Sequence, residues 1–303
     1  MRLTLNLNDN KGFEEACTRS RVLIEEARIL ASRALAGESS VRRLGLGLEY
    51  EDFREYRPGD DLRMIDWRVT ARMPDPVAGY RLMVRERRTE RRVRVAVLVD
   101  LTASQDFGEK ASAVLFTCSL IAWVLEALGD YVAVAVLSSG VRVAWSLRGR
   151  ALPVFVTREV CSARPTGSVG LLEGVKALSA GVRRAGLLVL TDYAHTPEDF
   201  RRSLTAARAL GLRPYVILAL DPWEVAELGE EVLLQDVERV EVGWGPEVSR
   251  AVRRHLEAVR NVLTSMRVRW VEVMGVEGAR RRVNEVLELV ARAREEGSSG
   301  PGA

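Results

Sequence analysis

Four short apolar runs along the middle of the chain constrain its fold more than any other feature. Each is apolar at consecutive rather than alternating positions, which is typical of strands buried on both faces; the runs are residues 93–99, 131–137, 187–190 and 215–220. Helical patterns lie between them, at residues 111–128, 169–180 and 197–210. Alternating strands and helices predict a mostly parallel sheet with right-handed crossovers, flanked by helices. We therefore expect an α/β fold.

The segment before these strands has two parts. Residues 14–36 carry an apolar face at helical spacing and end at Gly37, which predicts an amphipathic helix. The chain then loses the helical period and is punctuated by Gly and Pro, which predicts a small β-rich unit with strands at residues 50–56 and 77–84.

The segment after these strands completes the predicted fold. A hairpin over residues 230–242 is expected to join the small β-rich unit, residues 252–266 and 268–273 predict a helix and a strand, and a last helix is expected to end at Arg294. Residues 141–145 are expected to pair antiparallel with the second strand. We divide the chain into an N-terminal helix with the small β-rich unit, an α/β core, a C-terminal part and a disordered tail: residues 1–92, 93–220, 221–296 and 297–303.

Composition narrows the classes of function. The 45 basic and 42 acidic side chains nearly cancel, so we expect no nucleic-acid partner. Cys17, Cys118 and Cys161 share no metal-ligand or redox spacing, and the first residues lack a secretory signal, which favours a reducing, cytoplasmic location. The apolar run at 111–128 is interrupted by polar residues, which indicates a buried helix and no membrane span. The high content of Arg, Val and Glu suits a thermophile.

Polar residues follow two of the predicted strands and one connecting loop. Asp100, Thr102 and Ser104 come directly after the first strand, and in an extended loop their side chains would point the same way. Asp192 follows the third strand, and Thr166 precedes a helix. Because ligands bind at the carboxyl ends of parallel strands, these oxygens predict a Mg²⁺ or Mn²⁺ site. The alternative is that the hydroxyls cap helices and Asp100 binds backbone amides.

The pattern Asp100-x-Thr102-x-Ser104 with Thr166 and Asp192 resembles the metal-ion-dependent adhesion site of von Willebrand factor A domains. Longer motifs are similar to the signature of the domain of unknown function 58 family, from about residue 41 to the last helix. They are Gly45-Leu46-Gly47-Leu48-Glu49-Tyr50, Arg54-Glu55-Tyr56-Arg57-Pro58-Gly59-Asp60-Asp61-Leu62-Arg63, Ile65-Asp66-Trp67, Ala71-Arg72 and Asp221-Pro222-Trp223-Glu224.

This resemblance implies a von Willebrand factor A-like (Rossmann-like) core and an association with MoxR-type AAA+ ATPases, and it implies no established catalytic activity. The chain departs from the family pattern in having Thr102 where Ser is usual and Gln105 where Met usually follows. Thr102 keeps the hydroxyl ligand and adds a methyl group, so the departure bears on metal affinity.

Our leading hypothesis is a non-enzymatic interaction module whose metal binds an acidic side chain of a client, together with a MoxR-type ATPase. One alternative is a Mg²⁺-dependent phosphohydrolase with Asp100 as nucleophile, similar to haloacid dehalogenases, which need a second Asp where this chain has Thr102. Another alternative is a nucleic-acid-binding accessory protein. A hydrolase triad of Ser104, His195 and Asp192 lacks a Gly-x-Ser-x-Gly elbow, and His195 is expected to be a loop residue.

Residues 54–72 mix charges of both signs around the Pro58-Gly59 turn and include Trp67. This pattern favours an ion network that fixes the small unit onto the core. The alternative is a partner-docking surface beside the metal loops.

Overall fold

The four predicted strands lie at the centre of one sheet. The computed structural model describes residues 3–6, 12–36, 51–75, 79–87, 93–163, 165–226, 232–236 and 241–298. The largest sheet has the order β13-β10-β9-β6-β7-β8, and all neighbours are parallel except β7 and β8. Its strands are β6 (Arg94–Asp100), β7 (Tyr131–Leu137), β8 (Val141–Leu147), β9 (Ala185–Thr191), β10 (Leu212–Leu220) and β13 (Arg269–Met274). The predicted α/β class and mostly parallel sheet are confirmed.

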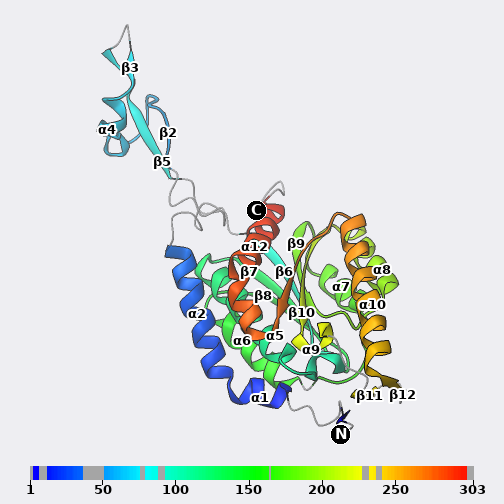
Figure 1. The fold of residues 1–303 in the computed structure, drawn as a ribbon. Coiled ribbons are helices and arrows are strands. Elements are labelled where there is room, and N and C mark those ends of the chain that lie inside the picture. The colour runs from blue at the N-terminus through cyan, green and yellow to red at the C-terminus, as the bar shows by residue number, and fades with distance from the viewer. Residues whose placement is uncertain are drawn as a thin grey trace.

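The sheet separates two apolar cores, which explains the consecutive apolar positions of its strands. Along β6, Val95, Val97 and Val99 belong to one core, while Ala96 and Leu98 belong to the other. Helices cover both faces (Figure 1). The first core is covered by α1 (Gly12–Thr18), α2 (Ser20–Ala36), α5 (Lys110–Ala127), α6 (Ala151–Ser162), α11 (Gly275–Arg281) and α12 (Val283–Ser298). The second is covered by α7 (Leu171–Ser179), α8 (Pro197–Ala209) and α10 (Gly245–Ser265).

Helix α5 is the central helix of the first core. It packs against α1, α2, α6 and α11. Of the described helices, it alone is long and apolar enough to cross a membrane by length and composition, and 78% of that stretch is buried inside the fold. The predicted buried helix is confirmed.

The ends of the predicted helices differ slightly from expectation. The N-terminal helix is interrupted at Arg19, so that α1 and α2 are separate helices. The last helix, α12, continues to Ser298, and the rest of the predicted tail lies outside the described residues.

The predicted small β-rich unit is two separate structures. Strand β1 (Leu3–Asn6) pairs in parallel with β11 (Val232–Asp236), which pairs with β12 (Glu241–Trp244). The other strands pair only among themselves, as β2 with β5 and β3 with β4. They are β2 (Glu51–Glu55), β3 (Pro74–Asp75), β4 (Gly79–Tyr80) and β5 (Met83–Arg87), accompanied by the short helices η2 (Leu62–Met64) and α4 (Trp67–Thr70). We call this second structure, residues 51–75 and 79–87, the β-unit.

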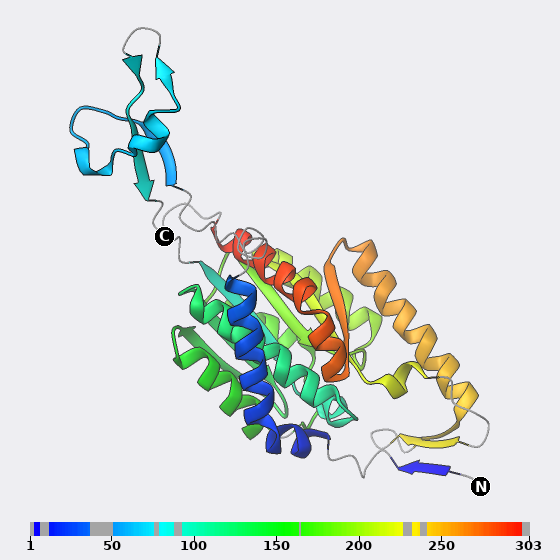
Figure 2. The same cartoon turned by 60° about the vertical axis from the view of Figure 1, so that its left-hand side comes forward.

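The β-unit stands apart from the remaining elements, the main body (Figures 1 and 2). It enters the sequence between α2 and β6. The ion pairs found in it, Arg54 with Asp60 at 2.6 Å and Arg81 with Glu55 at 3.2 Å, both join residues of the β-unit itself. These pairs close its own loops. That an ion network also fixes the unit onto the core stays a prediction. Figures 1 and 2 do not show the β-unit beside the predicted metal loops, where the alternative interpretation would put it.

A disulfide joins Cys17 of α1 to Cys161 of α6, with the two Cα atoms 5.5 Å apart. Both helices pack against α5, which brings together cysteines separated by 144 positions. The sequence spacing gave no sign of this pair. The expected reducing, cytoplasmic location stays a prediction.

Candidate functional site

Asp100 lies at the carboxyl end of β6, beside the end of β9, and its side chain is completely buried. Its Oδ1 accepts hydrogen bonds from the backbone N–H of Thr102 at 2.9 Å and from the Thr102 hydroxyl at 2.7 Å. Its Oδ2 accepts one from the Thr191 hydroxyl at 2.6 Å and lies 2.7 Å from Nε2 of His195. The carboxylate is therefore held by four polar groups, as a buried charge requires.

Asp100 and His195 form an ion pair beneath the surface. Burial opposes the charge on Asp100, but His195 and the hydroxyls of Thr191 and Thr102 outweigh it and hold the pKa of this carboxyl below its usual value. Burial likewise opposes the charge on His195, yet the hydrogen bond and charge of Asp100 raise the pKa of the imidazole. The pair favours carboxylate and imidazolium.

Thr102 and Ser104 follow Asp100 in a tight turn, because Ala103–Asp106 forms the short helix η3. The predicted extended loop is therefore wrong, although the Thr102 and Ser104 hydroxyl oxygens still lie 3.5 Å apart. Thr102 occupies the N-cap position of η3, yet its side chain makes no capping hydrogen bond. Since the Thr102 hydroxyl donates its hydrogen to Asp100, it can only accept from the Ser104 hydroxyl, which leaves one lone pair for another partner.

Thr166 lies in a loop that is hydrogen-bonded to the segment carrying Thr102 and Ser104. The backbone N–H of Ala103 donates to the carbonyl oxygen of Gly167 at 3.2 Å, which joins this loop to the segment after β6. The Thr166 hydroxyl lies 3.3 Å from the hydroxyl of Ser138, which follows β7. Thr102 is buried, Ser104 is half-buried and Thr166 is exposed, so the hydroxyls lead from the buried carboxylate to the surface.

Asp192 follows β9 and binds a cation of the protein itself. Nζ of Lys110, the first residue of α5, lies 2.9 Å from Oδ2 of Asp192 and 2.9 Å from Oε1 of Glu224. Burial opposes the charge on Lys110, but the two carboxylates raise its pKa above the ordinary value. Asp192 also accepts a hydrogen bond from the backbone of Ala194. The structure thus places Asp192 in a buried ion triad with Lys110 and Glu224.

The triad connects this edge of the sheet to α9 (Pro222–Val225). Asp221 caps α9 and accepts a hydrogen bond from the backbone N–H of Glu109 at 2.7 Å, while Glu224 accepts one from the backbone of Asp221. Burial raises the pKa of Glu224, against the opposing effect of Lys110. The Asp221-Pro222-Trp223-Glu224 motif is therefore a structural connection between α9 and the start of α5.

The hydroxyls of Thr102, Ser104 and Thr166 are the candidate ligands for a hard divalent cation. Within the described part of the chain, no three His, Cys, Asp or Glu side chains are grouped as metal ligands. A cation here would depend on hydroxyl oxygens and water, with Asp100, itself paired with His195, bonded to the Thr102 hydroxyl from beneath. Such oxygen ligation suits Mg²⁺ or Mn²⁺ and leaves coordination positions for an outside ligand.

The sequence analysis missed three residues of the candidate site. His195 was expected to be an ordinary loop residue, Lys110 was not considered, and Ser138 was not singled out. Ser138 could have been found, because it follows a buried strand next to β6. His195 and Lys110 carry no local signal, since their partners lie 95 and 82 positions away.

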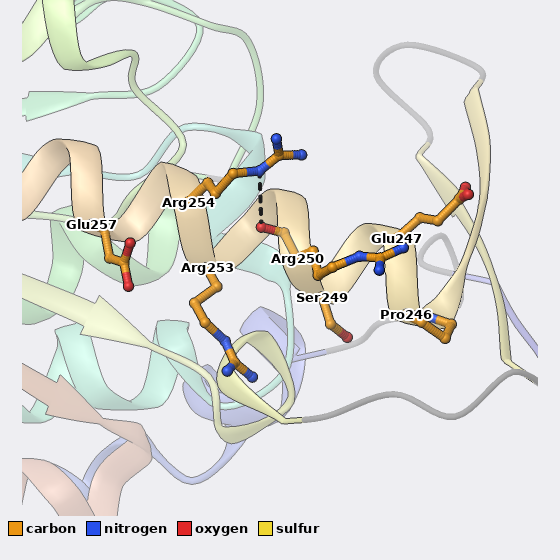
Figure 3. Close-up of a pocket in the computed structure, with 7 residues that line it drawn as sticks. All are labelled: Pro246, Glu247, Ser249, Arg250, Arg253, Arg254 and Glu257. Carbon is orange, nitrogen blue, oxygen red and sulfur yellow. Dashed lines mark hydrogen bonds between the residues drawn. The ribbon is translucent and has the colours of Figure 1, made fainter.

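A surface pocket lies elsewhere, along the first part of α10 (Figure 3). It is lined by Pro246, Glu247, Ser249, Arg250, Arg253, Arg254 and Glu257. All of these come from one helix, and both signs of charge are present. None of the predicted site residues lines this pocket.

The fold and the polar strand ends define an α/β protein with a candidate cation site at the carboxyl edge of a parallel sheet. The chain belongs to the family described as "Protein of unknown function DUF58", whose sequence model matches residues 52–263. It is 31% identical over 206 residues to the uncharacterized protein Rv1480 of Mycobacterium tuberculosis (strain H37Rv), and equally to Mb1516 of Mycobacterium bovis. These alignments cover 64% of this chain and 62% of each relative, so the chain spans less than two thirds of the relatives' length.

Some solved structures are similar to this chain at a lower sequence identity. A conserved hypothetical protein, BatB from Bacteroides thetaiotaomicron, aligns with a TM-score of 0.45 and 16% identity over 66% of this chain and 99% of its own. Proximal thread matrix protein 1 of the mussel byssus, solved with a zinc-occupied MIDAS motif, aligns with a TM-score of 0.40 and 15% identity over 66% and 48%. Neither similarity identifies the function of this chain.

Proposed function

We propose that the chain is a non-enzymatic, divalent-cation-dependent interaction module of the von Willebrand factor A type. The observation that carries the proposal is the hydroxyl series above a buried carboxylate. Asp100 is fully hydrogen-bonded beneath Thr102, and Ser104 and Thr166 continue toward the surface. Such a site has few protein ligands, so an acidic group from another protein can complete it.

Each residue has a distinct part in this proposal. Thr102, Ser104 and Thr166 would hold the cation through hydroxyl oxygens. Asp100 orients the Thr102 hydroxyl by accepting its hydrogen at 2.7 Å, and Asp192, whose carboxylate pairs with Lys110, would not be a direct ligand. A bound Mg²⁺ or Mn²⁺ would supply positive charge and coordination positions open to a partner's carboxylate.

The surroundings of Asp100 support a binding role over the phosphohydrolase alternative. A nucleophilic carboxylate needs an oxygen that can reach the substrate, whereas Asp100 is completely buried and both oxygens accept hydrogen bonds. The position two residues on is Thr102, which cannot serve as the general acid that such enzymes need.

A MoxR-type AAA+ ATPase, or an acidic client that it acts on, is the partner we propose. The support is the family membership, together with a site that needs an outside oxygen ligand. A carboxylate bound to a partly desolvated cation contributes about 1–3 kcal/mol to such a complex.

Mn²⁺ binding followed by electron paramagnetic resonance tests the site. We expect one weak site in the wild type that is lost in Ser104→Ala and Thr166→Val. Ser168→Ala, which removes an exposed hydroxyl two positions further along the same loop, is the matched control and should bind normally. Equal Mn²⁺ binding by all four proteins would exclude this site.

The partner link is tested by measuring the affinity for a purified MoxR-type ATPase with and without EDTA. EDTA and Thr166→Val should weaken the complex to the same extent and non-additively, because both remove the same contact, the one made through the metal. If the ATPase binds and neither change alters the dissociation constant, the metal bridge is wrong.

A further inference from the structure

A covalent link holds helix α1 beside the segment that carries Ser104. The disulfide between Cys17 and Cys161 fixes the last turn of α1 to α6. Toward its other end, α1 packs against η3, the short helix that contains Ser104. A helix of only seven residues therefore connects the crosslink to the candidate cation site.

The contact between α1 and η3 is close and specific. The backbone N–H of Phe13 donates to Oδ1 of Asp106 at 2.9 Å. The preceding Gly12 lies so near the chain that a Cβ there would collide with the carbonyl oxygen of Gly108 and lie 2.9 Å from that of Asp106. A shift of α1 must therefore either move η3 or break the hydrogen bond between Phe13 and Asp106.

Helix η3 is weakly held by its own residues. Gln105, which lies between Ser104 and Asp106, is completely buried, yet neither polar atom of its amide has a hydrogen-bond partner among the described residues. Leaving a buried amide unsatisfied costs stability. Thr102, at the N-cap position, makes no capping hydrogen bond with its side chain. The position of η3 therefore depends on neighbouring elements, and α1 is one of them.

We propose that the disulfide between α1 and α6 sets the cation affinity of the candidate site by positioning Ser104 through Asp106. Asp106 is a positioning residue, because it would act on the cation only through η3. When a dithiol reductant breaks the S–S bond, two electrons and two protons pass to the two cysteines, and the reductant is oxidised to a disulfide. Without the link to α6, α1 no longer fixes η3, and Ser104 loses its fixed position beside Thr102. The inference rests on the proposed function, since it assigns a regulation to that cation site.

Mn²⁺ binding to the full chain, followed by electron paramagnetic resonance, tests the coupling. The protein is compared in the oxidised form and after reduction with dithiothreitol, which is then removed under argon, at a temperature where circular dichroism shows both forms folded. Reduction should raise the dissociation constant at least about fivefold, which is typical of coupling between two sites. Cys17→Ser should bind Mn²⁺ like the reduced wild type under both conditions. Cys118→Ala, which removes the buried unpaired cysteine, is the matched control and should keep the full response.

A second variant separates the position of η3 from the crosslink itself. Asp106→Ala removes the acceptor of the Phe13 N–H and leaves both cysteines of the disulfide in place. Its Mn²⁺ affinity should be low and independent of the oxidation state. Asp61→Ala, which removes a carboxylate that accepts a backbone N–H at η2 of the β-unit, is its control and should respond like the wild type.

Hydrogen exchange measured by mass spectrometry keeps this inference separate from the proposed function. The N–H groups of Gln105 and Phe107 are hydrogen-bonded to carbonyl oxygens of the same segment. Reduction should therefore speed exchange in the peptide that covers residues 102–108, with or without a cation. Faster exchange without any Mn²⁺ binding would contradict the proposed function and still support the positioning of η3 by the disulfide.

Two results would overturn the inference. One is equal exchange of residues 102–108 in the oxidised and reduced protein, which would make the crosslink a structural brace between α1 and α6. The other is Mn²⁺ binding by the wild type with an affinity that reduction does not change, or a response to dithiothreitol that persists in Cys17→Ser.

Discussion

Along β6 of the main body, successive side chains enter two large apolar cores, whereas the β-unit buries only Ile65, Met83 and Val84 among its described apolar residues. The ion pairs of the two regions also differ in how far they are buried. Lys110 and Asp192 pair with almost no exposure, while Arg54 and Asp60 pair in contact with water. Because apolar burial provides most of the free energy of folding, the main body is expected to be stable by itself. In the β-unit, the described contacts that close its loops are polar, such as the Arg54–Asp60 pair.

The largest effect should come from a charge placed in the first core. Leu120 of α5 is completely buried, so Leu120→Asp would bury an unpaired carboxylate and lower the free energy of unfolding by several kcal/mol. Urea denaturation followed by circular dichroism measures this. Val154→Asp, at an exposed position of α6, is the control and should change it by less than about 0.5 kcal/mol. An unchanged Leu120→Asp transition would contradict the assignment of α5 to the core.

The second effect concerns the buried ion triad. Lys110→Met leaves the carboxylates of Asp192 and Glu224 without their cation, and breaking a buried pair in this way costs about 3–5 kcal/mol. The same denaturation measurement applies. Adding Asp192→Asn should recover part of the loss, because it removes one of the stranded charges. A loss below about 1 kcal/mol would indicate an ion pair no more important than an exposed one.

The third effect concerns the disulfide of the main body. Reducing the Cys17–Cys161 disulfide removes the crosslink between α1 and α6, which typically lowers the free energy of unfolding by about 2–4 kcal/mol. Thermal melting with and without dithiothreitol should therefore differ for the wild type and not for Cys17→Ser. Cys118 is buried and unpaired, so Cys118→Ala should keep the response to dithiothreitol. The same melting curves for the oxidised and reduced wild type would show that the crosslink does not form or does not stabilise.

The smallest effect concerns the Arg54–Asp60 ion pair, which closes a loop of the β-unit. The hydrogen bonds from Arg54 and from the backbone of Arg57 lower the pKa of Asp60 from 3.8 to about 2. The stabilising effect of this carboxylate is thus present above pH 3.8 and is lost as the pH falls toward 2. In Arg54→Ala, the pKa of Asp60 should return toward its ordinary value, as followed by the carboxyl carbon signal in nuclear magnetic resonance. An unchanged titration would show that Arg54 does not hold Asp60 in solution.

The difference between the two regions also explains what could be predicted from the sequence. The main sheet was predictable because a strand buried on both faces must be apolar at consecutive positions, as Val95 to Val99 are. The β-unit has no comparable pattern, so its strands were located roughly and its separation from the β1–β11–β12 sheet was missed. Its shape depends on individual contacts, such as Asp66 capping α4 and Thr70 binding the backbone of Met83.

The candidate site was predictable only in part. Asp100, Thr102 and Ser104 are close in sequence and follow a strand, so their proximity could be deduced. The partners that decide their chemistry come from other elements: His195 follows β9, and Lys110 begins α5. Nothing in the sequence near these two residues indicates which carboxylate each will meet, and the Cys17–Cys161 pair was missed for the same reason.

The position of the β-unit in the chain has a mechanical consequence. The unit is tethered at both ends, to α2 on one side and to the start of β6 on the other. A pull on the β-unit is therefore transmitted to β6, which lies between β9 and β7 and pairs with both in parallel register. A load along β6 shears these ladders, so many hydrogen bonds must yield together rather than one after another. In a single-molecule experiment, the main body should resist force applied through residue 87 better than force that peels away the edge strand β8.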